Sequence, residues 1–511
     1  MSNFIKIYLW QAISIILNFV ALFVVTPYLS SQPSLFGIYS IVISLYIFLS
    51  YADLGFITAG MKYASECYAR NDRNLEIRII GFVGFIFSVF VAIYAIFIAV
   101  ISFNPNILVK SLENATEVKM ASQLLISLAI FSPVFVGQKI VQLIFGVRLE
   151  DYRFQRILSV ANAVKILSVL YFFSDGKYRI VEYFIFSQFC GLLAVVTGGW
   201  VARKRLNYDF ILLFKSFTFD RLIYNKTSKL AYASLLLTLF WIFYYEIDLF
   251  VIGRFLGPKA VAIFAIGISV LTLFRTLFGV IFTPFTAKFN HFVGLNDKEG
   301  MKSFFMKVLV IGLPLTTFPV ISATMSMQSF IFSWVGSAYS DSVSLTQVLL
   351  LSYVFSFISY PAGTLVMAYE KIRALLITSA ILPVIYWLGI ILTYSYFGLM
   401  SFAYFKLIAF TFSAAVYSMM VIRIFSIKWT DLLSEIILPA IFPCLVLVGF
   451  MFLVRDVLPL EKSKLNLFIF AGINGLAVCL AMVVYYFSSS LFRSYSSQIL
   501  NRFNFNSSKW N

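Results

Sequence analysis

Apolar stretches long enough to cross a lipid bilayer follow one another along almost the whole of this 511-residue sequence. A helix of roughly twenty apolar residues spans the hydrocarbon core, and about fourteen such stretches occur here. The sequence therefore predicts an all-α polytopic membrane protein with about 14 transmembrane helices. The expected spans are 8–30, 36–59, 79–103, 121–147, 155–174, 180–201, 230–256, 259–286, 302–325, 345–369, 373–396, 399–425, 433–455 and 463–488.

The scarcity of charge supports this interpretation. Only 12% of the residues are charged and 61% are hydrophobic, whereas a soluble domain carries about 25% charged residues. So few charges could not cover a water-facing surface of this size. We therefore expect lipid to face most of the protein.

The basic residues gather in the short segments between spans, although the chain as a whole carries a formal charge of +17. Cytoplasmic segments of membrane proteins are enriched in Lys and Arg, which explains the charge without a nucleic-acid partner. With Lys6 in the cytoplasm, the cytoplasmic segments hold about 26 of the 39 basic residues and the opposite side about 9. We expect an inner-membrane-type protein with both termini cytoplasmic. The basic clusters comprise Arg70, Arg73 and Arg78; Arg148, Arg153 and Arg156; and, in 202–229, Arg203, Lys204, Arg205, Lys215, Arg221, Lys226 and Lys229.

A weak internal repeat divides the chain at its richest basic segment. Residues 37–45 read GIYSIVISL and residues 262–270 read AIFAIGISV, an offset of 225. Six expected spans separate the copies, so both have the same orientation, as in transporters built from two parallel halves. We predict two six-helix lobes related by a pseudo-two-fold axis, with two further C-terminal helices. The predicted parts are 1–205, a basic cytoplasmic linker at 206–229, 230–426, and a final pair with a tail at 427–511.

Seven charged residues fall inside the expected spans, where an isolated charge is costly and usually faces the bundle interior or a watery cavity. The cations favour a cavity for an anionic substrate such as a phosphate, diphosphate or acidic sugar. The alternative is that the charges pair, Arg275 with Asp248 for example, and only hold helices together. Asp53 has a further alternative, which is to end its helix in the ADLGF turn. The residues are Lys139, Lys165, Arg275 and Lys406, and Asp53, Glu246 and Asp248.

Several classes of site are excluded by what the sequence lacks. His291 is the only histidine, and the four cysteines show no metal-ligand spacing, so no metal site or catalytic centre is expected. The phosphate-binding motif GxxxxGK[ST] is missing, which argues against ATP-driven transport by this chain. We expect a transporter without a resident cofactor, and not an enzyme.

Three stretches resemble bacterial polysaccharide flippases, the O-antigen and lipid-linked-oligosaccharide translocases of the multidrug/oligosaccharidyl-lipid/polysaccharide exporter superfamily. They read TPYLSSQPSLFGIYSIVISLYIFLSYADLGF at 26–56, KYASECYARND at 62–72 and EIDLFVIGRFLGPKAVAIFAIGISVL at 246–271. The resemblance implies two lobes around a central, often cationic cavity. It also implies that undecaprenyl diphosphate bearing one glycan repeat unit passes from the cytoplasmic to the periplasmic leaflet by alternating access.

On this resemblance, Lys139, Lys165, Arg275 and Lys406 would attract the diphosphate or acidic glycan. Asp53, Glu246 and Asp248 would be salt-bridge partners or would couple transport to H⁺ or Na⁺. A polysaccharide polymerase and a chain-length regulator would be partners. Many members of the family have twelve helices, so the two extra spans are a departure; in some relatives an extra pair lines a groove for the lipid tail.

Two rival functions stay open at this point. A multidrug/cation antiporter of the same superfamily would have a similar fold, but it would favour acidic residues in its cavity. A membrane glycan polymerase or ligase would usually need a long external loop, and no expected non-cytoplasmic loop exceeds about twenty residues.

Overall fold

The computed structural model describes residues 2–49, 51, 55–110, 112, 114–174, 176–369 and 372–497, and these residues form helices and no strands. The predicted all-α class is therefore confirmed. Contacts divide the chain into two compact units, residues 1–265 (unit 1) and 266–511 (unit 2). The predicted division at 205, 229 and 426 stays a prediction.

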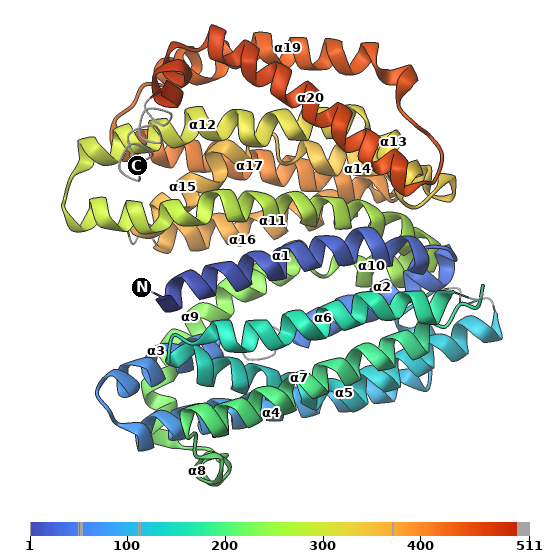
Figure 1. Ribbon diagram of the computed structural model, residues 1–511, viewed down its shortest axis with the longest axis vertical. Coiled ribbons are helices and arrows are strands. Elements are labelled where there is room, and N and C mark those ends of the chain that lie inside the picture. The colour runs from blue at the N-terminus through green and yellow to red at the C-terminus, as the bar shows by residue number, and fades with distance from the viewer. Residues whose placement is uncertain are drawn as a thin grey trace, which may run out of the picture. The chain divides into compact units, whose positions relative to one another are not determined.

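Unit 1 is a bundle of long helices joined by short turns (Figure 1). Its core lies between α3, α4, α5 and the start of α9, and includes Phe82, Ile144 and Phe145, each fully buried. The helices are α1 (Ser2–Leu29), α2 (Pro33–Leu49), α3 (Phe56–Ala69), α4 (Arg73–Ser102), α5 (Ala115–Val147), α6 (Asp151–Phe173), α7 (Ile180–Leu206), α8 (Phe210–Lys215), α9 (Arg221–Tyr245), α10 (Asp248–Leu256) and the first residues of α11 (Pro258–Gly294).

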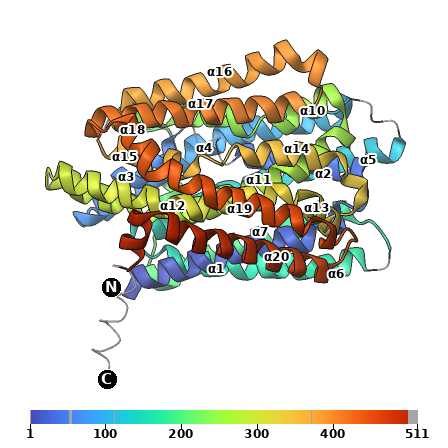
Figure 2. The ribbon, with the colours of Figure 1, turned by 90° about the horizontal axis from the view of Figure 1, so that it is seen from above.

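Unit 2 contains the rest of α11 and the helices that follow it. Figure 2 shows α16 and α17 side by side, an arrangement that their many contacts confirm. The helices are α12 (Lys298–Met325), α13 (Met327–Trp334), α14 (Asp341–Leu351), α15 (Ser356–Ala368), α16 (Ile372–Phe397), α17 (Met400–Phe425), α18 (Trp429–Leu432), the π-helix η3 (Leu433–Ile437), α19 (Leu438–Leu453) and α20 (Lys464–Ser488).

The number of spans agrees closely with the prediction. In the described residues, 11 helices are long and apolar enough to cross a membrane, and two bent pairs raise the number to 13. The remaining predicted span, 36–59, corresponds to the shorter apolar helix α2. Each predicted span therefore has a helical counterpart in the described residues.

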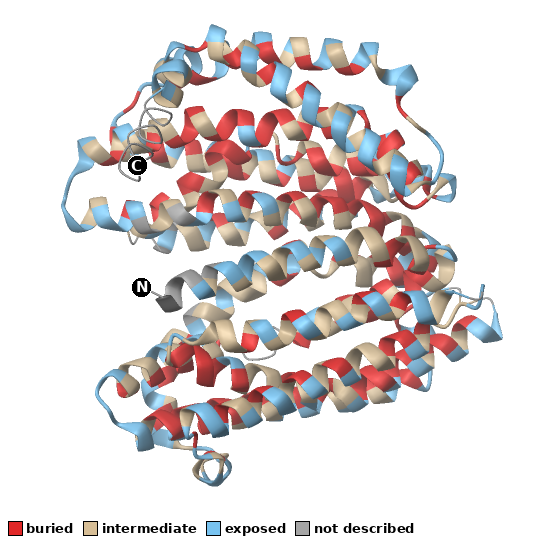
Figure 3. Cartoon of the chain, viewed as in Figure 1, coloured by how far each residue is buried: buried red, intermediate tan, exposed pale blue. Residues whose placement is uncertain are grey.

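Burial separates core helices from peripheral ones in unit 2. In the most apolar window of α12, 61% of residues are buried, whereas the value for α20 is 11%. Figure 3 shows the same contrast, with buried residues along α12 and exposed ones along α20. Because apolar side chains cover the exposed face of α20, for example Leu465, Phe468 and Phe487, this face suits hydrocarbon rather than water.

The internal repeat has a structural counterpart with the same offset. Helices α2 and α11 begin at Pro33 and Pro258, and α4 and α12 begin at Arg73 and Lys298, so both pairs are 225 residues apart. Proline suits a first helical position because it has no N–H to leave unpaired. The turns before α4 and α12 also match: Asn71 and Asn296 have φ of 59° and 53°.

Three predicted spans are interrupted. Span 36–59 is divided between α2 and α3, and Gly55 begins α3 with φ of 78°, a left-handed conformation that favours glycine. Span 230–256 is divided between α9 and α10, and α9 begins nine residues earlier than predicted, at Arg221. Span 345–369 consists of α14 and α15, which meet at 48°.

The segment predicted as a linker, 206–229, is largely helical. It contains α8 and the first turns of α9. The Asp209 carboxylate accepts a hydrogen bond from Leu212 N at 2.9 Å, and Asp220 accepts bonds from Leu222 N and Ile223 N at 2.9 and 3.2 Å. Aspartate at these positions pairs backbone N–H groups that have no partner within the helix, so each residue fixes a helix start.

Candidate functional site

Two of the predicted cavity cations, Lys139 and Lys165, lie on long helices of unit 1. Lys139 on α5 places its Nζ 5.5 Å from the centroid of the Phe135 ring. Lys165 on α6 is half-buried and has the buried Cys190 of α7 as an electrostatic neighbour. In the described part of the chain, no carboxylate lies within 4 Å of the Lys165 ammonium.

The predicted acidic residues Glu246 and Asp248 lie at the break between α9 and α10. Ser44 Oγ on α2 donates to the Glu246 carbonyl at 3.0 Å, and the Tyr51 hydroxyl donates to Glu246 Oε1 at 3.3 Å. Asp248 is 1% exposed and occupies the first turn of α10, where the helix dipole favours a negative charge. Asp53 lies outside the described residues.

The other two predicted cations, Arg275 and Lys406, lie in unit 2. The Arg275 carbonyl on α11 accepts a hydrogen bond from the Tyr360 hydroxyl of α15 at 3.4 Å. Lys406 on α17 is 0% exposed, and its Nζ lies 4.9 Å from the centroid of the buried Tyr386 ring. A cation over an aromatic face is stabilised by the ring quadrupole. That the four cations share one cavity stays a prediction.

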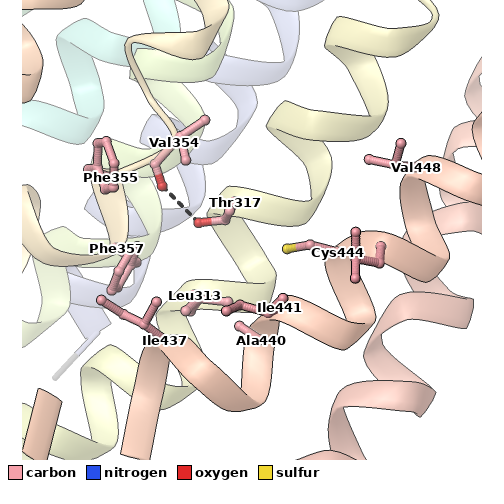
Figure 4. Close-up of a pocket in the computed structure, with 11 residues that line it drawn as sticks. Leu313, Thr317, Val354, Phe355, Phe357, Ile437, Ala440, Ile441, Cys444 and Val448 are labelled. Atoms are coloured by element: carbon pink, nitrogen blue, oxygen red, sulfur yellow. Dashed lines mark hydrogen bonds between the residues drawn. The ribbon is translucent and has the colours of Figure 1, made fainter. Parts of the chain in front are cut away.

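An apolar groove in unit 2 is a candidate binding surface among the described residues. It consists of two cavities of about 260 and 210 Å³ that share Phe355, Phe357 and Ile437. The first cavity (Figure 4) is lined by Leu313, Thr317, Val354, Phe355, Phe357, Ile437, Ala440, Ile441, Cys444, Leu445 and Val448. The second adds Leu309, Ile358, Thr411, Ala414, Ala415, Ser418, Trp429, Leu432 and Ile436.

The break between α14 and α15 forms one wall of this groove. Breaking the helix releases the Val354 carbonyl from its usual partner, and Thr317 Oγ1 of α12 donates to it at 2.8 Å (Figure 4). An unpaired backbone group in hydrocarbon costs several kcal/mol, so the threonine makes the break tolerable. The break then allows Phe355 to face the groove.

The opposite wall of the groove is the π-helix η3 and the start of α19. Pro439, the second residue of α19, lies two residues after η3. It has no N–H to donate, and its ring would clash with the carbonyl four residues earlier. A π turn before the proline relieves that clash, and such turns often accompany functional sites. The widened turn brings Ile437 to both cavities. The resemblance noted a lipid-tail groove at an extra pair of spans in some relatives, but the residues that line the groove here were not predicted, although Pro439 and Pro443 were a visible signal.

A buried charge cluster at one end of unit 1 was also missed. Glu76 of α4 is 0% exposed. Arg148, directly after α5, donates a hydrogen bond to Glu76 Oε2 at 3.1 Å and forms an ion pair with Oε1 at 2.8 Å. Arg73 contacts the same carboxylate at 3.4 Å. Arg148 Nη1 also donates to the Ile144 carbonyl at 2.8 Å. Arg148 lies in the turn after α5, between two spans as predicted, but its guanidinium is buried and paired instead of facing water.

Two tyrosines complete this cluster. The Arg148 guanidinium lies 5.0 Å from the ring centroids of Tyr68 and Tyr208. Burial, followed by the nearby Glu76 carboxylate, raises the pKa of Tyr208 well above its usual value, although Arg148 opposes this. Four elements of unit 1 meet here: α3, α4, α5 and the turn after α7. The cluster ties them into one rigid end.

Comparisons with solved structures identify the fold. The lipid II flippase MurJ, in an inward closed conformation, matches with a TM-score of 0.68 at 13% identity, covering 95% of this chain and 98% of MurJ. An inward-facing multidrug resistance MATE transporter matches with a TM-score of 0.63 at 14% identity, covering 79% and 94%. A transporter of the same superfamily (MOP) from Pyrococcus furiosus, described as having reversed polarity in its binding pocket, matches at 0.53 and 12% identity, covering 83% and 93%.

No family model and no curated protein sequence matches the chain. At these identities the likeness concerns the arrangement of the helices and not the substrate. The chain therefore has the fold that the lipid II flippase MurJ and the MATE transporters share.

Proposed function

We propose that this protein is a flippase that moves a lipid-linked oligosaccharide across the bacterial inner membrane. The apolar groove of unit 2 is the observation that carries the proposal. From Ile437 to Val448 the groove follows α19 for about 17 Å. A groove of this length and composition suits the apolar chain of a polyprenyl lipid, because burying apolar surface stabilises the complex at about 25 cal/mol per Å².

The carrier would be undecaprenyl diphosphate bearing one repeat unit of O-antigen or a similar surface polysaccharide. Its diphosphate is anionic, and Lys139, Lys165, Arg275 and Lys406 would attract it. Asp53, Glu246 and Asp248 would pair with these cations or couple transport to H⁺ or Na⁺. Transport would run from the cytoplasmic to the periplasmic leaflet by alternating access, with a polymerase and a chain-length regulator acting on the product.

The fold comparisons support a flippase over an antiporter. The lipid II flippase covers 95% of this chain, whereas the MATE transporter covers 79%. Nearly every helix of this chain therefore has a counterpart in the flippase, whereas about a fifth of the chain has none in the MATE transporter.

A multidrug/cation antiporter is the second candidate, because the MATE transporter also shares the fold, with a TM-score of 0.63. Cationic drugs would be repelled by an ammonium such as that of Lys165, which has no carboxylate within 4 Å in the described residues. Expression in an efflux-deficient host separates the candidates. Raised drug resistance would favour the antiporter, and unchanged resistance the flippase.

The groove is tested with a matched pair of cysteine variants. Cys444 lines the groove on α19, whereas Cys479 is exposed on α20. In a strain without its own flippase, Cys444→Trp fills the first cavity and should reduce surface polysaccharide at least about tenfold. Cys479→Trp should leave export unchanged. Equal export by the two variants at equal protein levels would contradict a lipid-binding role for the groove.

The cations are tested separately in the same strain. Lys165→Ala and Arg275→Ala should reduce export, and deletion of the protein should cause single lipid-linked repeat units to accumulate. Full export by both variants would contradict the cavity role. Accumulation of long unexported chains instead of single units would contradict the flippase and favour a polymerase.

A further inference from the structure

The segment that joins α7 to α9 exposes large apolar side chains where a soluble loop would be polar. Ile211 and Phe214 of α8 are 70% and 72% exposed, and Phe219 and Leu222 are 55% and 79% exposed. Contiguous exposed apolar side chains mark a surface that meets lipid or another protein. Ile211 and Phe214 are three residues apart on α8, so they lie on one face of that helix and form an apolar patch.

The same segment is strongly basic, and its acidic groups are already engaged. Arg203, Lys204, Arg205, Lys215 and Arg221 are all exposed. Asp209 caps α8, while Asp220 caps α9 and forms an ion pair with Arg78 at 2.7 Å. The five exposed cations outnumber the two carboxylates, so the surface beside the apolar patch presents net positive charge.

Packing against α4 places this segment at the depth where the hydrocarbon core begins. A side chain on Gly81 or Gly84 would collide with Ser216 or Phe217, so the two glycines allow the segment to approach α4 closely. The Phe217 and Phe85 rings are 6.5 Å apart, and those of Phe219 and Phe82 are 5.9 Å apart. These α4 residues belong to the apolar part of the span, a few residues after it begins, and Figure 1 shows α8 beside α4 at that end.

A tryptophan on α7 indicates the same depth. Trp200 is 59% exposed and lies one turn before Lys204, whose Nζ is 4.9 Å from its ring centroid. Tryptophan is enriched at the level of the lipid headgroups. An exposed tryptophan packed against a lysine is the pairing expected beside lipid headgroups.

We propose that residues 203–222 form a binding surface for anionic phospholipids in the leaflet at this end of unit 1. Ile211 and Phe214 insert among the acyl chains, while Lys204, Arg205 and Lys215 contact the negatively charged headgroups. An apolar side chain with flanking basic residues is the combination that binds interfaces rich in anionic lipid. The positive-inside expectation makes this the cytoplasmic leaflet.

The proposal is tested on the full chain by lipid-dependent thermal unfolding. Phosphatidylglycerol added to the detergent-solubilised protein should raise the unfolding temperature, and phosphatidylcholine should raise it less. Replacing Lys204, Arg205 and Lys215 with Gln should weaken the apparent affinity for phosphatidylglycerol by at least about fivefold. The response to phosphatidylcholine should not change.

Two control variants and inorganic phosphate test whether the lipid preference depends on the position and the charge of these lysines and arginines. Replacing the exposed Lys110, Lys119 and Lys177 with Gln removes the same charge at the opposite ends of these spans and should leave the preference intact. Lys204→Arg with Lys215→Arg retains the charge and should also retain the preference. Inorganic phosphate should neither stabilise the protein nor compete. Equal losses in the two Gln variants, or no preference in the unmodified protein, would overturn the proposal.

The apolar half of the surface has its own measurement. In bilayer nanodiscs containing phosphatidylglycerol, the amides of residues 207–219 should exchange with deuterium slowly. Ile211→Ser with Phe214→Ser should speed this exchange at least about tenfold while the exchange of α4 stays unchanged. Fast exchange in the unmodified protein would show that the patch lies outside the bilayer.

Discussion

Helices α4 and α12 occupy corresponding places in the internal repeat, but one buries a charged side chain where the other buries an apolar one. The fourth residue of α4 is Glu76, and the fourth residue of α12 is Met301, exactly one repeat offset away. Both side chains are buried, at 0% and 1% exposure. Unit 1 therefore buries an ion pair where unit 2 buries a thioether among Phe289 and Phe305.

This difference teaches that the position requires burial but no particular polarity. A buried ion pair is often replaceable by apolar groups of similar volume at little cost, whereas removing one partner is expensive. In unit 2 the corresponding position of the helix holds an apolar side chain, Met301. The ion pair of unit 1 is therefore not needed for the fold itself.

The units also interrupt different spans. In unit 1 the second span breaks at Gly55, which has positive φ, and the fourth span, α5, is continuous over 33 residues. One offset later, Val280 replaces the glycine, and α11 is continuous over 37 residues. In unit 2 the span that corresponds to α5 breaks, between α14 and α15. A β-branched residue cannot adopt the left-handed conformation cheaply, which explains why α11 does not break at this point.

The largest effect is expected from splitting the ion pair. Arg148→Ala leaves the buried Glu76 with only the half-exposed Arg73 at 3.4 Å, and should lower the free energy of unfolding by about 3–5 kcal/mol. Replacing Glu76 with Met, the residue at the corresponding position of unit 2, together with Arg148→Met should cost clearly less than the single change. Detergent-induced unfolding followed by circular dichroism measures both. A double variant that is less stable than Arg148→Ala would refute the comparison.

A smaller effect is expected from giving α4 a side chain that α12 has. Gly81 corresponds to Met306, and Gly81→Met would push against the Ser216 backbone. Overpacking of this kind costs about 1–3 kcal/mol. Limited proteolysis should cut the 206–219 segment faster in this variant. The reverse change, Met306→Gly, should leave that cleavage rate as it is.

The threonine beside the broken span should matter less. Thr317→Val removes the donor to the Val354 carbonyl and should cost about 1 kcal/mol. Unit 1 has Ala92 at the corresponding position, and its fourth span is continuous, so no donor is needed there. Ala92→Ser is the matched control and should change the unfolding midpoint very little. No loss in Thr317→Val would mean that the carbonyl has another partner.

The smallest expected effect is the difference in stability loss between Ala variants of two corresponding helix caps, Asp72 and Asp297, which should be close to zero. Asp72 accepts from Leu75 N at 3.0 Å, and Asp297 accepts from Gly300 N at 2.8 Å. Each Asp→Ala change should cost about 1 kcal/mol, because both residues cap a helix in the same way. The two losses, measured by the same unfolding assay, should agree within about 0.5 kcal/mol. A larger difference between the two losses would show that the two aspartates do not cap their helices equally well.

Sequence reasoning predicted the features that depend on local composition. Runs of apolar residues located the spans, and a nine-residue similarity gave the offset of 225 that the helix starts at Pro33 and Pro258 reproduce. The breaks were harder, because a glycine in an apolar run is compatible with a continuous helix. The conformation of Gly55 and the hydrogen bond from Thr317 depend on neighbours in space.

Side-chain partners far apart in sequence were beyond prediction. Arg148 stood among the basic residues expected in a loop, yet its partner Glu76 lies 72 residues earlier. The groove is built from α12, α15, α17 and α19, and no single segment carries its pattern. Lys406 was expected to face a cavity, and in this conformation it has no exposed surface. Its role in transport stays a prediction.

The constant offset between Pro33 and Pro258, and again between Arg73 and Lys298, has a practical consequence for protein engineering. Forty residues separate the two starts in each copy, so the segments can be exchanged without altering any connection length. By the starts of α7 and α17, Ile180 and Met400, the offset has fallen to 220. A chimaera that exchanges residues 33–72 with 258–297 would thus keep its length. An exchange extended to the starts of α7 and α17 would replace one segment with another that differs by five residues, and the turns would have to accommodate the difference.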